Sequence, residues 1–164
     1  MTKLEMNGRS RIDIKEYCSL ARESGAYKDI ELDLLAETLS VWMERPGDPY
    51  VLLDLRDGKI LAGFAIICKA SNTEYTYDLR LLSIEKAYIG KGVAQRLIAI
   101  IEEEILKTEP VAILRAEISR TKEDSVGRGL FEAEGFSCIG HIVDFYEAGD
   151  DFYMFAKFLR RAEE

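Results

Sequence analysis

The stretch from Leu79 to Leu97 constrains the fold of this chain more than any other. It begins as an apolar strand, passes through a turn that contains Gly90 and Gly92, and continues as a helix with an unbroken apolar face. A turn of this kind leaves several backbone N–H groups unpaired at the helix start, where the positive end of the helix dipole also lies. Because glycine lets the backbone approach a bulky anion closely, the stretch predicts a phosphate or pyrophosphate site.

Hydrophobic periodicity predicts the elements around this stretch. Helical spacing covers residues 12–23, 30–44, 92–107 and 122–134, and strand patterns cover residues 50–55, 59–68, 75–84, 111–118, 136–146 and 152–159. The pair Asp57-Gly58 predicts a two-residue hairpin turn between the first two strands. The strand 111–118 is nearly all apolar, which suits a strand covered on both faces. The order predicts a mixed α/β (α+β) fold, with a mostly antiparallel sheet flanked by helices.

Length and composition limit the possible classes of protein. The 164 residues predict a single domain spanning 1–164, and 48% hydrophobic residues suffice for a core. No apolar run approaches the roughly 18 residues that span a membrane, and the polar N-terminus lacks a signal segment, so we expect a cytoplasmic protein without a membrane partner. The net charge, 22 − 30 = −8, argues against a nucleic-acid partner and suits a cationic or neutral substrate.

The three cysteines, Cys18, Cys68 and Cys138, are odd in number and lack paired metal-ligand spacing. Each has apolar neighbours, so we expect small core residues rather than disulfides or metal ligands. His141 is the single histidine, and its position in a predicted strand favours a structural role. We therefore expect no metal.

Two other glycine-rich sites fit the central turn less well. A dinucleotide-binding turn needs Gly-x-Gly-x-x-Gly, but Gln95 stands at the third place. A P-loop needs Gly-x-x-x-x-Gly-Lys-Ser/Thr, and the sequence has no such run. A strand, turn and helix with a purely structural role remain an alternative.

The order of elements and the central turn resemble the GNAT superfamily of acyl-CoA-dependent N-acetyltransferases from Ile30 onward. The family's turn reads Gln/Arg-x-x-Gly-x-Gly/Ala. Residues 89–94 match it at Gly92 and Ala94, with Ile89 where Gln or Arg is usual.

A second GNAT signature, Asn-x-x-Ala-x-x-Leu-Tyr-Glu-x-x-Gly-Phe, corresponds to residues 124–136. Four places match and three depart: the matches are Leu130, Glu132, Gly135 and Phe136, and the departures are Asp124, Gly127 and Phe131. The chain also resembles a bacterial and archaeal subgroup with a Tyr-x-x-Gly-Asp-Asp ending, here residues 146–151, and with the strand Tyr77-Asp78-Leu79.

The resemblance implies acetyl-CoA as co-substrate. Its pantetheine arm would lie along the strand that ends at Ile84, its diphosphate over residues 89–95, and the Leu82 N–H would polarise the thioester carbonyl. The residues expected at the cofactor are Ile84, Ile89, Gly90, Lys91, Gly92, Val93, Ala94, Gln95, Asp124 and Phe131.

Acetyl transfer also needs groups that move protons. An alkylamine with a pKa of about 10 is mostly protonated at neutral pH, so a carboxylate or a water chain must take its proton. Asp78 is the first choice for this base, with Glu85 and Glu117 as alternatives. Family members often protonate the leaving thiolate with a tyrosine where this chain has Phe131. Tyr146 or Tyr153 could substitute, or the thiolate could take its proton from solvent.

The predicted function is direct transfer of an acetyl group from acetyl-CoA to a primary amine of a small molecule or a peptide. The departures at Ile89 and Phe131 keep open an acyl-CoA-binding sensor or regulatory module without turnover. A third possibility is a partner-binding domain that uses the final hairpin to form a homodimer. We expect the acceptor pocket between the first two helices and the loops 69–74 and 147–151.

Overall fold

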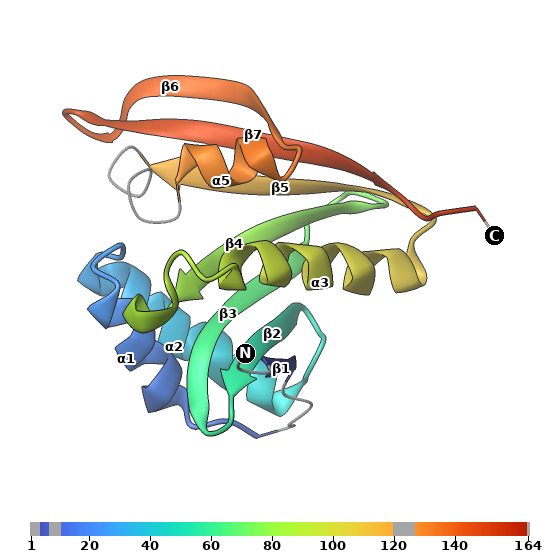
Figure 1. Ribbon diagram of the computed structural model, residues 1–164. Coiled ribbons are helices and arrows are strands. Elements are labelled where there is room, and N and C mark those ends of the chain that lie inside the picture. Colours follow the sequence, from blue (N-terminus) through green and yellow to red (C-terminus); the bar gives the residue numbers. More distant parts are fainter. Residues whose placement is uncertain (1–3, 7–10, 120–126, 164) are drawn as a thin grey trace.

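The computed structural model describes residues 4–6, 11–119 and 127–163 (Figure 1). The helices are α1 (Ile14–Glu23), α2 (Asp29–Glu44), α3 (Val93–Thr108) and α5 (Arg128–Ala133), with a 3-10 turn η1 (Lys86–Tyr88). The strands are β1 (Glu5–Met6), β2 (Tyr50–Asp57), β3 (Ile60–Lys69), β4 (Thr76–Ile84), β5 (Val111–Ser119), β6 (Ser137–Glu147) and β7 (Asp150–Arg160). None of the helices in these ranges is both long enough and apolar enough to cross a membrane.

The described strands form one sheet in the order β1-β2-β3-β4-β5-β7-β6. Neighbours pair antiparallel except β4 and β5, which run parallel and are joined by the crossover helix α3. This arrangement confirms the mixed, mostly antiparallel fold predicted from the order of elements. The short strand β1 was not predicted, because a two-residue strand carries no periodicity.

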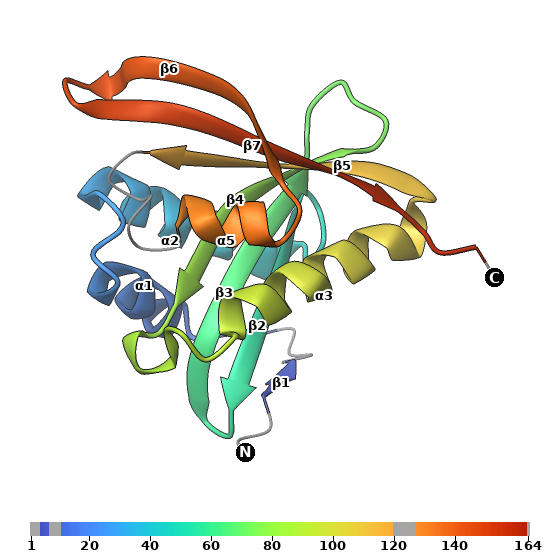
Figure 2. The same cartoon turned by 45° about the horizontal axis from the view of Figure 1, so that its top comes forward.

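Helices cover the sheet on two faces, with α1 and α2 on one side and α3 and α5 on the other (Figures 1 and 2). Tyr17, Leu39 and Phe64 belong to the core beneath α1 and α2. Leu97 and Phe155 belong to the larger core beneath α3 and α5. The sheet is thus the middle layer of three. A gap between its strands would connect the two faces of the sheet.

A buried polar network ties α1 to the sheet. The Tyr17 hydroxyl donates to Oδ2 of Asp54 at 2.5 Å, and Asp54 is only 3% exposed. Arg56 donates from Nη1 and Nη2 to the two carboxylate oxygens of Glu16, at 3.0 and 2.7 Å. The bond from Tyr17 satisfies the Asp54 carboxylate, which would otherwise be costly to bury.

Two predicted boundaries shift. The last predicted helix, residues 122–134, is described only from Arg128, because Gly127 has a φ of +77°, which a right-handed helix does not accommodate; residues 120–126 lie outside the described ranges. In the β2–β3 turn the central residues are Gly58 and Lys59, one place later than predicted, since Asp57 pairs with Ile60.

Two burial predictions were wrong. In β5 burial alternates, with Leu114 and Ala116 inside and Glu117 exposed, so helices cover this strand on one face only. Cys138 is exposed rather than in the core, because β6 is the edge strand of the sheet. Cys18 and Cys68 are half-buried.

Candidate functional site

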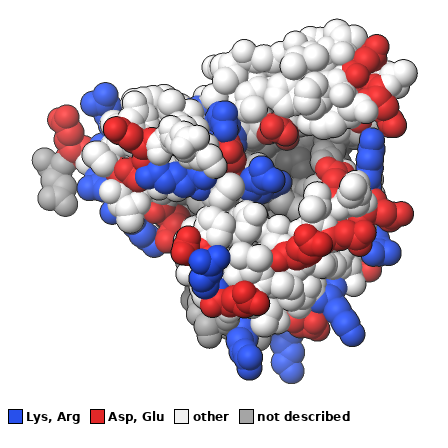
Figure 3. Space-filling view, turned by 180° about the vertical axis from the view of Figure 1, so that it is seen from behind, with Lys and Arg blue, Asp and Glu red and all other residues white. Residues whose placement is uncertain are grey.

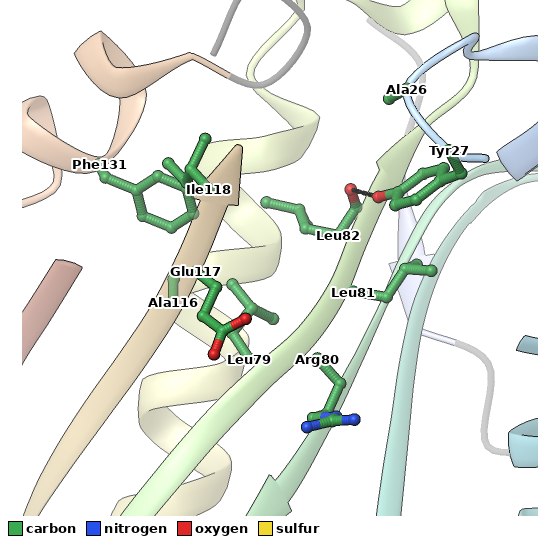
Figure 4. Close-up of a pocket in the computed structure, with 10 residues that line it drawn as sticks. All are labelled: Ala26, Tyr27, Leu79, Arg80, Leu81, Leu82, Ala116, Glu117, Ile118 and Phe131. Carbon is green, nitrogen blue, oxygen red and sulfur yellow. Dashed lines mark hydrogen bonds between the residues drawn. The ribbon is translucent and has the colours of Figure 1, made fainter. Parts of the chain in front are cut away.

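The parallel strands β4 and β5 separate along their length. Their pairing runs from Thr76 opposite Ile113 to Leu79 opposite Ala116 and no further. On its other edge β4 has a register irregularity at Arg80, where consecutive residues of β3 pair with Leu79 and Leu81. A gap therefore opens between the ends of β4 and β5 (Figure 4). Its lining residues are Ala26, Tyr27, Leu79, Arg80, Leu81, Leu82, Ala116, Glu117, Ile118 and Phe131.

The backbone of β4 presents polar groups to this gap. The N–H of Glu85 donates to the carbonyl of Ala62 on β3 at 2.9 Å. Because bonding directions alternate along an antiparallel strand, the backbone groups of Leu82 and Ile84 point away from β3, toward the gap. The Tyr27 hydroxyl donates to the Leu82 carbonyl at 2.7 Å from that side, as Figure 4 shows. The Leu82 N–H therefore points into the gap, and its role as the oxyanion contact stays a prediction.

The chain after β4 forms a tight turn before α3. The Glu85 carboxylate accepts from the N–H of Ala87 at 2.6 Å and so caps η1. Gly90 and Gly92 then adopt φ values of +77° and +80°, in the left-handed region that favours glycine. Glu85 is therefore occupied in shaping the turn.

The start of α3 exposes backbone donors. The first bond of the helical ladder runs from the Arg96 N–H to the Gly92 carbonyl at 3.0 Å. The N–H groups of Val93, Ala94 and Gln95 precede that bond, and Gly92 has no side chain to cap them. Within the described ranges these three N–H groups have no partner, and three such donors at the positive end of a 16-residue helix make a suitable anion site.

A hollow lies against this helix start, and the structure brings together there most of the predicted cofactor residues. It is lined by Ile84, Tyr88, Ile89, Gly90, Val93, Ala94, Gln95 and Leu130. Gly92 and Lys91 belong to the same turn, and Nζ of Lys91 lies 5.4 Å from the centre of the Tyr88 ring. Ile89 is 59% exposed, so an apolar side chain stands at the rim of the hollow.

Two other predicted cofactor residues lie elsewhere in the chain. Phe131 is 3% exposed, with its ring edge-on to Phe136 and stacked on Phe155, and it also forms a wall of the β4–β5 gap. Packing therefore accounts for Phe131 without a ligand. Asp124 lies outside the described residues.

Asp78, the predicted base, is held by Arg115 on β5. Nε of Arg115 donates to Oδ1 at 2.7 Å and Nη2 donates to Oδ2 at 3.0 Å, and the Asp78 side chain is 22% exposed. Both carboxylate oxygens are thus engaged in charge-assisted hydrogen bonds that hold β4 to β5. The same pair raises the pKa of Arg115, chiefly through the hydrogen bonds to Asp78.

A second hollow lies on the side of the sheet that carries α2. It is lined by Glu31, Asp78, Leu79, Arg80, Arg115, Glu117, Ser119, Tyr146 and Met154. Glu117 is the carboxylate, among the described residues, that lines both this hollow and the β4–β5 gap. Figure 4 shows its side chain reaching from β5 between the two strands.

The two predicted tyrosines lie on different sides of the sheet. Tyr146 lines the hollow beside α2, where burial and then the charges of Glu117, Asp150 and Glu31 raise its pKa to about 12. Tyr153 packs against the core beneath α3 and α5. Its ring stacks on His141 with centroids 4.5 Å apart.

The Gly-Asp-Asp ending organises the β6–β7 hairpin. Oδ2 of Asp151 lies 2.7 Å from Nε2 of His141, and Oδ1 accepts from the Asp144 N–H at 3.0 Å. The Gly149 N–H donates to Oδ1 of Asp144 at 2.7 Å. These contacts fit the structural role predicted for His141.

Sequence reasoning missed three polar residues at the site: Tyr27, Glu31 and Arg115. Arg115 had a usable signal, because a lone arginine in an apolar strand needs a partner and the adjacent parallel strand offered Asp78. Tyr27 and Glu31 gave none, since their positions depend on how α1 and α2 pack on the sheet.

Comparison with known proteins places this geometry in a fold family. No protein-family model matches the chain, and neither does any curated protein. Among solved structures, a GNAT-family protein from Desulfovibrio desulfuricans superposes with a TM-score of 0.85 at 22% identity, over 94% of this chain and 98% of that one. The ribosomal-protein-S18-alanine N-acetyltransferase of Escherichia coli gives 0.75 at 17% identity, over 99% and 97% of the two chains. An aminoglycoside 6'-N-acetyltransferase in complex with coenzyme A gives 0.74 at 14% identity, over 99% of each chain.

Proposed function

We propose that this chain, which has the fold of the GNAT acetyltransferases, transfers an acetyl group from acetyl-CoA directly to a primary amine. The observation that carries the proposal is the juxtaposition of two backbone features. The edge of β4 at Leu82 and Ile84, which β5 does not pair, leads through the η1 turn to the N–H groups of Val93, Ala94 and Gln95, which have no partner among the described residues. An extended thioester with a diphosphate at one end suits both features.

The donor would be held mainly by backbone groups. The diphosphate would lie over residues 89–95, where N–H groups and the helix dipole favour negative charge. The pantetheine arm would pair with the β4 edge as an added strand does. Because backbone atoms make these contacts, an isoleucine at position 89 removes one polar side-chain contact and leaves the rest of the site in place.

The chemical step we propose is a direct displacement. A carboxylate base takes one proton from the bound ammonium, and the neutral amine nitrogen then attacks the thioester carbonyl carbon. The C–N bond forms, the C–S bond breaks with its electron pair leaving on sulfur, and the second proton that nitrogen loses passes to solvent. The Leu82 N–H, aimed into the gap, would stabilise the negative charge on the carbonyl oxygen. A preorganised donor of this kind contributes about 10²-fold or more to the rate in other enzymes.

Glu117 is the base that the geometry favours. It lines both the gap, where the thioester would lie, and the hollow beside α2, where the amine would enter. Asp78 is bound by Arg115 through both oxygens, and Glu85 caps η1. We therefore propose Glu117, which the sequence offered as an alternative, as the general base in place of Asp78.

The leaving thiolate would take its proton from solvent. The reference pKa of a cysteine thiol is about 8.5, whereas burial and nearby carboxylates raise the pKa of Tyr146 to about 12. Proton transfer from Tyr146 to the thiolate would then be unfavourable. We therefore assign Tyr146 to hydrogen bonding with the acceptor rather than to acid catalysis.

Release of CoA thiol from acetyl-CoA, followed across a panel of amines, tests the proposal. We expect turnover with at least one primary amine, and we expect Glu117→Gln to lower kcat by about 10²-fold or more while acetyl-CoA affinity stays unchanged. Glu132→Gln, at an exposed position of α5, is the matched control and should keep wild-type kcat. Tight acetyl-CoA binding without thiol release on any amine would instead support the sensor function.

The final hairpin keeps a homodimer among the proposals. β6 is the outer strand of the sheet, and Ile139 and Val143 on it are 61% and 65% exposed. An exposed apolar edge strand is a ready surface for pairing with another chain. Light scattering should give twice the monomer mass of 18.6 kDa, and a monomer at all protein concentrations would remove this proposal.

A further inference from the structure

The hollow beside α2 has features that distinguish between classes of amine. It lies between α2 and the β6–β7 hairpin, and Figure 3 shows this side of the molecule with charged side chains beside a broad uncharged surface. The inference drawn from it rests on the proposed acetyl transfer, because the hollow is assigned to the acceptor.

The described lining of the hollow carries little net charge. Glu31, Asp78 and Glu117 contribute three negative charges and Arg80 and Arg115 contribute two positive ones, so the sum is 2 − 3 = −1. An excess of one negative charge suits one ammonium group.

The negative charge is concentrated near Glu117 and Tyr146. Asp78 and Arg115 are joined by two hydrogen bonds and largely cancel each other. The raised pKa of Tyr146, due first to burial and then to Glu117, Asp150 and Glu31, reports a negative and partly desolvated surrounding at its hydroxyl. An ammonium placed there would meet a carboxylate and a phenol oxygen together.

An apolar surface continues outward from Tyr146. The Phe145 ring lies edge-on to Tyr146 and tilted against Phe152, with centroids 4.9 Å apart in both pairs. Phe145 remains 52% exposed despite these contacts. On α2, next to Glu31, Ile30 and Leu34 are 68% and 56% exposed. A second cation beyond the first ammonium would therefore stand over apolar side chains.

We infer that the acceptor is a small primary amine with a single positive charge and an apolar body. Its ammonium lies between Glu117 and Tyr146, and its body lies on the aromatic side chains of Phe145, Tyr146 and Phe152. Burying an apolar group on this surface favours binding, whereas the further charges of a polyamine or an aminoglycoside would exceed the net charge of −1 of the described lining.

Calorimetric titration of amines into the protein, with and without CoA, tests this inference without requiring turnover. We expect 2-phenylethylamine to bind at least about tenfold more tightly than ethanolamine and spermidine, the gain expected from burying its ring. Phe145→Ser should weaken 2-phenylethylamine binding by about fivefold or more and leave ethanolamine binding unchanged. Ile139→Ser, at an exposed apolar residue earlier on the same strand, is the control and should leave both affinities unchanged.

The possible outcomes separate this inference from the proposed function. Tightest binding of spermidine, or of a tripeptide with an N-terminal phenylalanine, would overturn the amine class while leaving acetyl transfer in place. Equal effects of the Phe145 and Ile139 variants would overturn the assigned position of the apolar body. If the wild-type protein did not bind CoA, in contrast, the proposed function would be overturned. The ranking of amine affinities measured without CoA would still decide which class of amine the hollow binds.

Discussion

Arg115 holds both carboxylate oxygens of Asp78, at 2.7 Å from Nε to Oδ1 and 3.0 Å from Nη2 to Oδ2. The pair bridges β5 and β4 near the end of their parallel pairing, where Asp78 lies opposite Arg115 in the register. It thus ties the two strands together just before they separate to form the gap. A carboxylate used in this way serves the geometry of the site more than proton transfer.

We therefore predict that Asp78→Asn changes kcat by less than about threefold, far below the 10²-fold or more expected for loss of a general base. The asparagine keeps one acceptor for Arg115, so stability should fall by only about 1 kcal/mol at this partly exposed pair. Thiol-release kinetics and urea unfolding measure the two quantities. A 10²-fold loss of kcat with unchanged stability would return Asp78 to the role of base.

Tyr146→Phe tests the assignment of the phenol to the acceptor. Removal of one hydrogen bond worth about 1 kcal/mol should raise KM for the amine by about fivefold, with kcat and acetyl-CoA affinity nearly unchanged. Because the pKa of Tyr146 is raised to about 12, the hydroxyl stays protonated through any practical assay. The variant and the wild type should then have the same pH profile between about pH 7 and 10. An alkaline limb lost only in the variant would show that Tyr146 acts as an acid.

The network beneath α1 makes a separate prediction for stability. Tyr17→Phe removes the donor to the buried Asp54 carboxylate and should lower the free energy of unfolding by about 1–3 kcal/mol. Tyr50→Phe is the matched control, since Tyr50 packs against the same core and makes no side-chain hydrogen bond within the described residues.

This loss should not depend on pH in the neutral range. Burial and then Asp54 raise the pKa of Tyr17, so the folded protein holds this proton more tightly than the unfolded chain. The hydroxyl is protonated in both states below the unfolded pKa of about 10, and its contribution decreases only above that pH. Urea unfolding at pH 7 and pH 9 should thus give the same difference between variant and wild type.

The parts of the fold that were predicted correctly depend on local patterns. Strong periodicity located α1, α2, α3 and strands β2 to β7 within a few residues, and the two glycines of the central turn correctly marked the left-handed residues that precede α3. The errors came where tertiary context overrides the pattern. Cys138 has apolar neighbours in sequence, yet it is exposed on an edge strand of the sheet.

The proposed base was harder to identify from the sequence for the same reason. The sequence does not show whether a carboxylate on a strand has an ion-pair partner. Asp78 and Glu117 can therefore be distinguished only from the structure, in which Arg115 lies opposite Asp78. Tyr27 could not be predicted either. Its contact with the Leu82 carbonyl joins a helix connection to a strand 55 residues away in the sequence.

The central claim is that the turn at residues 89–95 binds the diphosphate of an acyl-CoA, and calorimetry with acetyl-CoA tests it most directly. We predict one molecule bound per chain, and binding at least about tenfold weaker, or about 1.4 kcal/mol, for Gly92→Val. Gly47→Val is the matched control, because Gly47 has a similar φ of +85° against +80° and lies in the loop between α2 and β2. Both variants carry the same backbone strain, so only crowding of the diphosphate should separate them. Absence of any binding heat with the wild-type protein, or equal affinities for the two variants, would contradict the claim.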